Sequence, residues 1–206
     1  MAGNARFWLS AGMALPKLIL ASASPRRSEL LRRLDVEFQV VSSNAAEVLQ
    51  EQLTPSELAQ INAYRKARAV SKRYPDYLVL GADTVVTLRG KLFGKPANLA
   101  EARRMLEVLQ GDTHQVVTGV SMIHLRHRRE RLFAEITEVT FRPLTLEQID
   151  RYLASMNPLD KAGGYAIQEG GDALVQDVVG SYFNVVGLPL ERLKAELGRW
   201  SGGVTE

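Results

Sequence analysis

The sequence predicts a mixed α/β fold that is not a regular alternation of parallel strands and helices. Short apolar runs suited to strands alternate with amphipathic segments that begin at helix caps. Two long strand-like segments, Gln115–Leu125 and Leu132–Phe141, follow each other with only a short charged tip between them. Neighbouring strands joined so closely pair antiparallel, which a fold built only from parallel strands does not contain.

The chain begins its regular structure with a strand, a helix and a second strand. Lys17–Ala21 is a short apolar strand, and Pro25–Leu34 is a helix whose leucines share one face. Phe38–Val41 has the composition of another strand.

Capping signals place the middle elements. Thr54-Pro55-Ser56-Glu57 is a capping box with proline at the first helical position, so a helix runs from there to about Arg73. Tyr77–Leu88 reads as a strand interrupted at Gly81-Ala82-Asp83-Thr84. Asn98 then caps a helix that ends at Gly111.

The last part of the chain follows the two long strands. Thr145-Leu146-Glu147-Gln148 is a second capping box and opens a helix to about Ser155. Ala173–Gln176 and Tyr182–Val185 are strand candidates. Leu190–Leu197 is predicted as a final helix that stops at Gly198.

Length and composition exclude several classes of protein. The 206 residues are 46% hydrophobic and 24% charged, which is ordinary for a soluble globular chain of one large domain or two joined lobes. No apolar run approaches the ~20 residues that span a bilayer, so we expect no membrane partner. The absence of cysteine excludes disulfides, thiolate metal sites and a cysteine nucleophile, and it fits a cytoplasmic protein.

The charge pattern gives little support to nucleic acid as a partner. Lysine and arginine number 26 against 23 acidic residues, a net charge of +3. The one dense basic run lies between the two long strands and is expected to be a solvated hairpin tip; it comprises Arg126, Arg128, Arg129 and Arg131. An RNA-binding protein stays an alternative, but the aromatic residues are scattered rather than arranged in a basic stripe.

The ends of the chain are expected to lie outside the domain. We expect residues 1–15 to be a disordered extension, residues 16–200 to form the domain and residues 201–206 to be a tail. Phe7–Leu15 is apolar and follows an arginine, as in a signal peptide, but it is short. Met13, which lies just before the first strand, is also a candidate for an alternative start of translation.

The turn after the first strand has the chemistry of a phosphate site. Ser22-Ala23-Ser24-Pro25-Arg26-Arg27 leads from a strand into a helix, with Ser24 as the expected N-cap. Arg26 and Arg27 in the first turn are disfavoured by the helix dipole, unless a bound anion compensates them. The alternative is a capped helix with two solvated arginines.

Two carboxylates are candidates for metal binding or general base catalysis. Asp83 follows a buried apolar run, and Glu47 follows a strand and a polar turn. If they meet in a cleft, their oxygens suit Mg²⁺ or Mn²⁺, and either could activate a water. The three histidines lack convincing ligand spacing, and His114 is expected to be a hydrogen-bonded structural residue. The alternatives are a turn-forming Asp83 and a surface Glu47.

Several basic residues could neutralise a triphosphate. Lys66 lies in the helix that begins at Thr54, Lys95 precedes a proline in a loop, and Lys161 follows Asp160 in a loop. Each of these lysines alone could be solvated. Together with the arginines of the first helix they could compensate about four phosphate charges, with a metal bridging the oxygens.

The motifs continue in a fixed order along almost the whole chain. After Ser22–Arg27 they are Glu47, Lys66-Ala67, Gly81-Ala82-Asp83-Thr84-Val85-Val86, Gly94-Lys95-Pro96, Gly111-x-x-His114-x-Val116-x-Thr118-Gly119, Asp160-Lys161-Ala162-Gly163 and Val186-Gly187-Leu188-Pro189. This series resembles the Maf-type nucleotide pyrophosphatases. The resemblance implies an inosine-triphosphatase-like fold, with a long twisted mixed sheet, flanking helices and a cleft between two lobes. It also implies a divalent metal, a homodimer and hydrolysis of a nucleoside triphosphate to the monophosphate and pyrophosphate.

The same resemblance assigns roles to residues. It makes Asp83 the catalytic base and matches Glu47, Lys66 and Lys95 to positions that line the active cleft. Glu47 and Asp83 are the expected metal ligands, and assisting Asp83 is the alternative role for Glu47. Substrate contacts are implied for Ser22, Ser24, Arg26, Arg27, Thr84, Lys161 and Gln168.

Residues 160–168 resemble the branch that acts on dTTP and UTP rather than the branch that acts on 7-methyl-GTP. The amide of Gln168 can match O4 and N3–H of uracil or thymine, and the resemblance links Arg26 and Thr84 to specificity. Gly164, Ala166 and Glu169 depart from the branch pattern. Modified pyrimidine nucleotides and a role in septum formation are further implications. A nucleotide sensor that binds without hydrolysis is the alternative.

Overall fold

The computed structural model describes residues 15–48 and 52–201. It confirms a mixed α/β fold, in which a seven-stranded sheet has the order β2-β1-β3-β5-β6-β7 and β4 adds to β3. The expectations for residues 1–14 and 202–206 lie outside the described residues.

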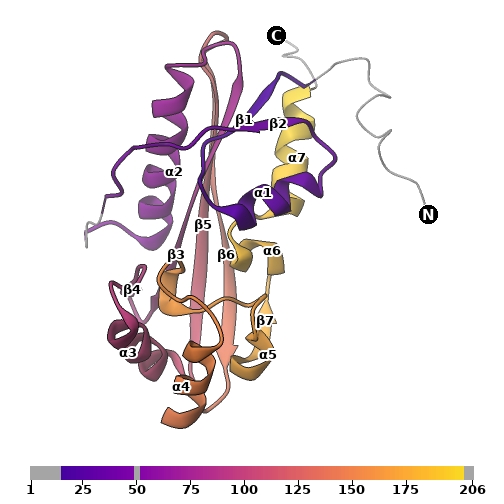
Figure 1. Cartoon of the computed structure of the whole chain (residues 1–206). Helices are drawn as coiled ribbons and strands as arrows, with labels where there is room; N and C mark the ends of the chain where they lie inside the picture. Colours follow the sequence, from indigo (N-terminus) through magenta and orange to yellow (C-terminus); the bar gives the residue numbers. More distant parts are fainter. Residues whose placement is uncertain (1–14, 49–51, 202–206) are drawn as a thin grey trace, which may run out of the picture.

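The strands of the sheet differ greatly in length. β1 (Leu18–Leu20), β2 (Phe38–Val40), β4 (Lys91–Phe93) and β7 (Val175–Val179) are short, whereas β3 (Leu78–Leu88), β5 (Thr113–His124) and β6 (Arg129–Phe141) are long. The long strands run along the length of the molecule in Figure 1. β1 pairs parallel with β2 and β3, while β3–β5, β5–β6 and β6–β7 are antiparallel, as predicted for the two long neighbours.

Helices gather toward the two ends of the long strands (Figure 1). Near one end lie α1 (Pro25–Arg32), α2 (Pro55–Ser71) and α7 (Leu190–Ser201), and near the other lie α3 (Leu99–Leu109), α4 (Leu146–Ala154) and α5 (Gly171–Leu174). Separate apolar clusters fill the two ends: one packs α1 and α7 against β1, β3 and β5, and the other packs α3 and α4 against the far halves of β3, β5 and β6.

The predicted helix starts are confirmed where the caps were strongest. Thr54 and Thr145 each form a complete capping box, and Asn98 accepts a hydrogen bond from the N–H of Glu101. Each cap satisfies backbone donors that the first helical turn leaves without partners.

Two glycines let α2 lie unusually close to the sheet. A Cβ atom at Gly119 would collide with the backbone of Ala59, and one at Gly81 would collide with the backbone of Ala63. Glycine at these positions therefore permits the close approach of helix and strand backbones. It also explains why β3 continues without the interruption predicted at 81–84, since Gly81 serves packing and not a turn.

Two other predictions near the C-terminus were wrong, and a third, a strand, began too early. Tyr182–Val186 is the short helix α6 and not a strand, because Ser181 caps it through the N–H of Asn184. The strand expected at 173–176 is β7 at Val175–Val179, preceded by α5. Gly198 does not stop the last helix, which continues to Ser201.

The basic tip is smaller than predicted. Arg129 and Arg131 belong to β6; Arg131 pairs with Glu196 of α7, and Arg129 donates to the carbonyls of Arg199 and Trp200. Arg126 pairs with Asp76. Within the described residues, no helix is long and apolar enough to cross a membrane.

Candidate active site

The sheet has an open edge beside Asp83. β1 and β4 both pair with the edge of β3 that faces away from β5, through Leu78–Leu80 and Val86–Leu88 respectively. Neither of these strands reaches residues 81–85 of β3. A break of this kind leaves space for a ligand where neighbouring chain segments diverge from the sheet.

A cavity of about 570 Å³ occupies this opening. Its wall includes every site residue predicted from the sequence: Ser22, Ser24, Arg26, Arg27, Glu47, Lys66, Asp83, Thr84, Lys95, Lys161 and Gln168. The volume lies in the usual range for small-molecule sites. The structure thus brings the predicted residues together, although their chemical roles stay predictions.

Asp83 and Thr84 reach different sides of the sheet, because successive side chains of a strand alternate. Asp83 faces α2, whose Lys66 and Asn62 contact its two carboxylate oxygens. Thr84 faces the other side, where Arg27 of α1 donates to its hydroxyl. The open edge of β3 lets both side chains line one cavity.

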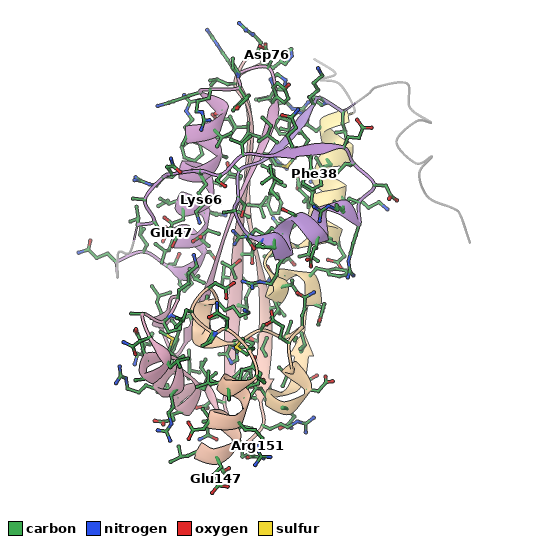
Figure 2. All side chains as sticks on the ribbon, in the orientation of Figure 1. Phe38, Glu47, Lys66, Asp76, Glu147 and Arg151 are labelled. Carbon is green, nitrogen blue, oxygen red and sulfur yellow. The ribbon has the colours of Figure 1, made fainter. Side chains whose placement is uncertain are left out.

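Lys66 joins the two predicted carboxylates. Its Nζ lies 2.6 Å from Oδ1 of Asp83 and 2.7 Å from Oε1 of Glu47. Figure 2 shows Glu47 and Lys66 near each other, between Asp76 at one end of the molecule and Glu147 at the other, and nearer to Asp76. Lys66 and Asp83 are largely buried, while the Glu47 side chain keeps 40% of its surface exposed. Lys66 is therefore not the solvated lysine of the alternative interpretation.

Glu47 is held in its charged form. Burial alone would raise the pKa of Glu47, but the hydrogen bond and charge of Lys66, with the charge of Lys95, hold this pKa below its usual value. The Nζ of Lys95 lies 3.6 Å from Oε1 of Glu47 and is half exposed. One carboxylate thus has two ammonium groups beside it, the buried one of Lys66 and the half-exposed one of Lys95.

Arg27 carries a charge that no carboxylate of the described residues contacts. Its guanidinium donates to the carbonyl of Gly187 at 2.9 Å, to Thr84 Oγ1 at 3.0 Å and to Ser22 Oγ at 3.4 Å. Burial lowers the pKa of Arg27, whereas the charges of Asp83 and Glu47 act in the opposite direction. An arginine stays protonated even so. A cation held by neutral oxygens in a cavity wall is suited to an anionic ligand.

Arg26 has a protein partner instead. Its guanidinium pairs with Asp160 Oδ2 at 3.0 Å, and the other carboxylate oxygen of Asp160 accepts a hydrogen bond from Lys161. Hydrogen bonds and charges from Lys161 and Arg26 outweigh burial and lower the pKa of Asp160. The first turn of α1 is thereby tied to the loop that carries Lys161 and Gln168.

Two details of this region differ from expectation. Ser24 occupies the N-cap position, but its side chain makes no capping hydrogen bond; its backbone N–H donates to Ser22 Oγ instead. Lys161 is buried rather than solvated, and its Nζ lies 3.5 Å from Glu169. Glu169 is absent from the wall of the main cavity and lies in a shallower neighbouring depression.

The histidine expectation is confirmed for His114. Its Nε2 is 2.8 Å from the hydroxyl of Tyr165, and burial lowers the pKa of His114 to about 4. Among the described residues, no group of three or more histidine and acidic side chains is arranged to hold a metal.

The sequence did not single out Asn62, and it named Gly187 only as part of a motif, without a contact in the site. Asn62, buried in α2, contacts Asp83, and the Gly187 carbonyl orients Arg27. Asparagine is a weak helix former, and its occurrence within a predicted helix was the available signal for Asn62. Nothing in the local sequence connects Gly187 with a residue so distant.

Comparison with known proteins bears on this arrangement. A family model described as Maf-like protein matches residues 17–200. The chain belongs to the Maf-like proteins. A protein of Bacillus thuringiensis named dTTP/UTP pyrophosphatase is 48% identical over 92% of this chain and 98% of that protein. One of Bacillus cereus with the same name is 47% identical over 94% of this chain and 95% of its own length.

The fold of this Maf-like chain also resembles a solved structure of low sequence identity. The Staphylococcus aureus Ham1 protein aligns with a TM-score of 0.51 at 14% identity, covering 89% of this chain and 98% of that one. This likeness supports the mixed sheet and its flanking helices.

Proposed function

We propose that this Maf-like protein is a nucleoside triphosphate pyrophosphatase that hydrolyses dTTP and UTP to the monophosphate and pyrophosphate. The observation that carries the proposal is the convergence of Asp83, Lys66 and Glu47 in a cavity whose wall also holds Arg27. The similarity to relatives named dTTP/UTP pyrophosphatase supports it.

The residues suggest how the reaction proceeds. Asp83 takes a proton from a water, which attacks the α-phosphorus. The bond from the α-phosphorus to the oxygen bridging the β-phosphate breaks, and pyrophosphate leaves. Arg27, Lys66 and Lys95 stabilise the charge that develops on the phosphate oxygens, which is the main catalytic contribution in such transfers. Arg26, Ser22 and Ser24 complete the phosphate-facing wall.

The donor set fits a divalent cation with oxygen ligands. Glu47 and Asp83 supply carboxylates on the cavity wall, and Mg²⁺ or Mn²⁺ is commonly held by one or two carboxylates together with substrate phosphates. Glu47 and Asp83 would hold the cation. When bound, it would supply positive charge to the phosphate oxygens.

Base selection falls to the loop around Gln168. Its side chain lies on the cavity wall, where its amide can both donate to and accept from a pyrimidine. Thr84 and Arg26 flank the same cavity and are proposed as specificity residues. Because Glu169 lies outside the main cavity, we expect this departure from the branch pattern to leave base preference unchanged.

The test measures pyrophosphate release from dTTP, UTP, CTP, GTP, 7-methyl-GTP and ITP, with Mg²⁺, Mn²⁺ or EDTA. Metal-dependent release confined to dTTP and UTP supports the proposal. Release from 7-methyl-GTP would keep the reaction and overturn the base assignment. Tight binding of all nucleotides without release would favour a sensor.

The same proposal extends to wider roles. Modified uridine and thymidine triphosphates are expected substrates, since a modification away from O4 and N3 leaves the Gln168 contacts intact. A homodimer of domains over residues 16–200 and a link to septum formation are also proposed. Sedimentation analysis and the cell length of a deletion strain test these two points.

A further inference from the structure

Asn62 contacts both the aspartate and the segment that carries the glutamate of the site. Its Nδ2 donates to Asp83 Oδ2 at 3.1 Å and to the carbonyl of Val48 at 3.1 Å, while its Oδ1 accepts from the N–H of Val48 at 2.7 Å. Asn62 retains only 2% of its accessible surface. One buried side chain therefore makes three hydrogen bonds and uses both ends of its amide.

The contact with Asp83 fixes the orientation of a carboxylate. Lys66 holds Oδ1 and Asn62 holds Oδ2, so the carboxylate plane cannot rotate without losing one bond. Without Asn62, Lys66 would be the one side chain of the described residues still bonded to the Asp83 carboxylate. A base whose oxygens turn away from the attacking water loses rate, because a displacement near 1 Å costs on the order of 10²-fold.

The contact with Val48 fixes the neighbouring acid. Val48 follows Glu47 directly, and no described strand or helix includes this segment. The two hydrogen bonds between the Asn62 amide and the Val48 backbone resemble the paired bonds between neighbouring β-strands. They hold this segment against α2. Glu47 can then reach Lys66, one helical turn beyond Asn62.

We propose that Asn62 is a positioning residue that sets Asp83 and Glu47 together, so that both acids reach the cavity in one fixed relation. This role rests on the proposed pyrophosphatase activity. It requires the amide of Asn62 itself, because the side chain must donate to Asp83 and accept from Val48. Asn62 is not placed on substrate or on the reacting atoms.

The experiment compares Asn62→Ala, Asn62→Asp and the matched control Asn184→Ala in the full chain. Asn184 is also a buried amide, and its Nδ2 donates to Val116 and Thr137. For dTTP, we expect Asn62→Ala to lower kcat on the order of 10²-fold with KM within about threefold. Asn184→Ala should lower the midpoint of thermal unfolding but leave kcat of the folded enzyme unchanged.

Backbone hydrogen exchange at residues 43–48 gives a readout independent of turnover. Asn62→Ala should speed exchange of the Val48 amide, whose acceptor is lost. Asn62→Asp keeps an acceptor for that amide but presents a second carboxylate to Asp83, so it should preserve protection and still lose kcat. Asn184→Ala should leave exchange in this segment as in the unaltered protein.

The outcomes separate the inference from the proposed function. An unaltered protein that releases no pyrophosphate overturns the proposed function and, with it, the positioning role of Asn62 in that reaction. An active protein in which Asn62→Ala keeps normal kcat overturns only the positioning role. Unchanged exchange at Val48 in Asn62→Ala overturns the tether to the Glu47 segment, whatever the activity.

Discussion

Asp83 and Gly119 lie directly opposite each other on β3 and β5, and both face α2. The absence of a side chain at Gly119 lets the backbone of α2 come close, so that Lys66 and Asn62 reach the Asp83 carboxylate. The position of the proposed base Asp83 therefore depends on the absence of a side chain at Gly119, its partner across the strand pair.

Gly119→Ala should destabilise the fold and move the helix. Its Cβ would meet the backbone of Ala59, which cannot yield as a flexible side chain can. We expect a loss of about 1–3 kcal/mol in the free energy of unfolding, as for other overpacked sites. Urea unfolding of Gly119→Ala and of the unaltered protein measures this loss. Gly94→Ala is the control, since nothing lies near its Cβ position; an equal loss in both variants would contradict the packing argument.

Asp83→Asn should nearly abolish turnover. The amide cannot accept the proton of the attacking water, and general base catalysis contributes about 10²–10⁴-fold. Single-turnover rates with dTTP test this, with the circular dichroism spectrum as the check on folding. A variant that retains more than a tenth of the rate would remove Asp83 from the role of base.

Arg27→Met should weaken binding of the triphosphate more than that of the nucleoside. Loss of a charged hydrogen-bond donor costs about 1.5–3 kcal/mol, so the KM for dTTP should rise about tenfold or more. Arg27→Lys should recover little, because one ammonium cannot reproduce the fork that spans Gly187, Thr84 and Ser22. Full recovery by lysine would show that charge alone is needed.

Gln168→Leu and Glu169→Gln should differ sharply. Only Gln168 lies on the wall of the main cavity, so its loss should reduce kcat/KM for dTTP and UTP by about 10-fold or more. Glu169→Gln should leave the ratio of dTTP to CTP hydrolysis within about twofold. Competition assays with mixed nucleotides measure both, and a changed ratio in Glu169→Gln would place that residue in base selection.

The fold should lose stability between about pH 6.5 and 4 through His114. Burial lowers the pKa of His114 to about 4, so the unfolded chain binds a proton there more readily than the folded one. The stabilisation is present above the unfolded pKa and is lost as pH falls, by roughly 2–3 kcal/mol. Between pH 7 and pH 4.5, the free energy of unfolding should fall more for the unaltered protein than for His114→Gln. Parallel pH dependence would contradict this.

The sequence predicted best where a local pattern determines structure. Thr54 and Thr145 reveal their helices through spacing alone, because capping is a contact within one turn. Tyr182–Val186 misled because aromatic and β-branched residues favour strands in general, whereas the cap at Ser181 and packing decide here. Gly81 misled because the helix that requires a glycine there comes from a distant part of the chain.

For the site, too, the sequence predicted the residues better than the contacts between them. The motifs named the residues that line the cavity, but not their partners. Asp160 pairs with Arg26, and Asn62 bonds to Asp83, across distances in sequence that no local rule covers. The anion expected beside the two arginines stays a prediction: Arg26 has a carboxylate partner, whereas Arg27 contacts no carboxylate among the described residues.

The hydrogen bond from Arg27 to Gly187 joins residues that are 160 positions apart. During synthesis, α1 leaves the ribosome long before the residue that orients its arginine exists. The cavity wall cannot close until almost the whole domain has emerged. Newly made chains should therefore gain activity late and all at once, as expected where distant contacts dominate folding. A fragment that lacks the last two helices would retain most of the motifs that line the cavity and still have no working site.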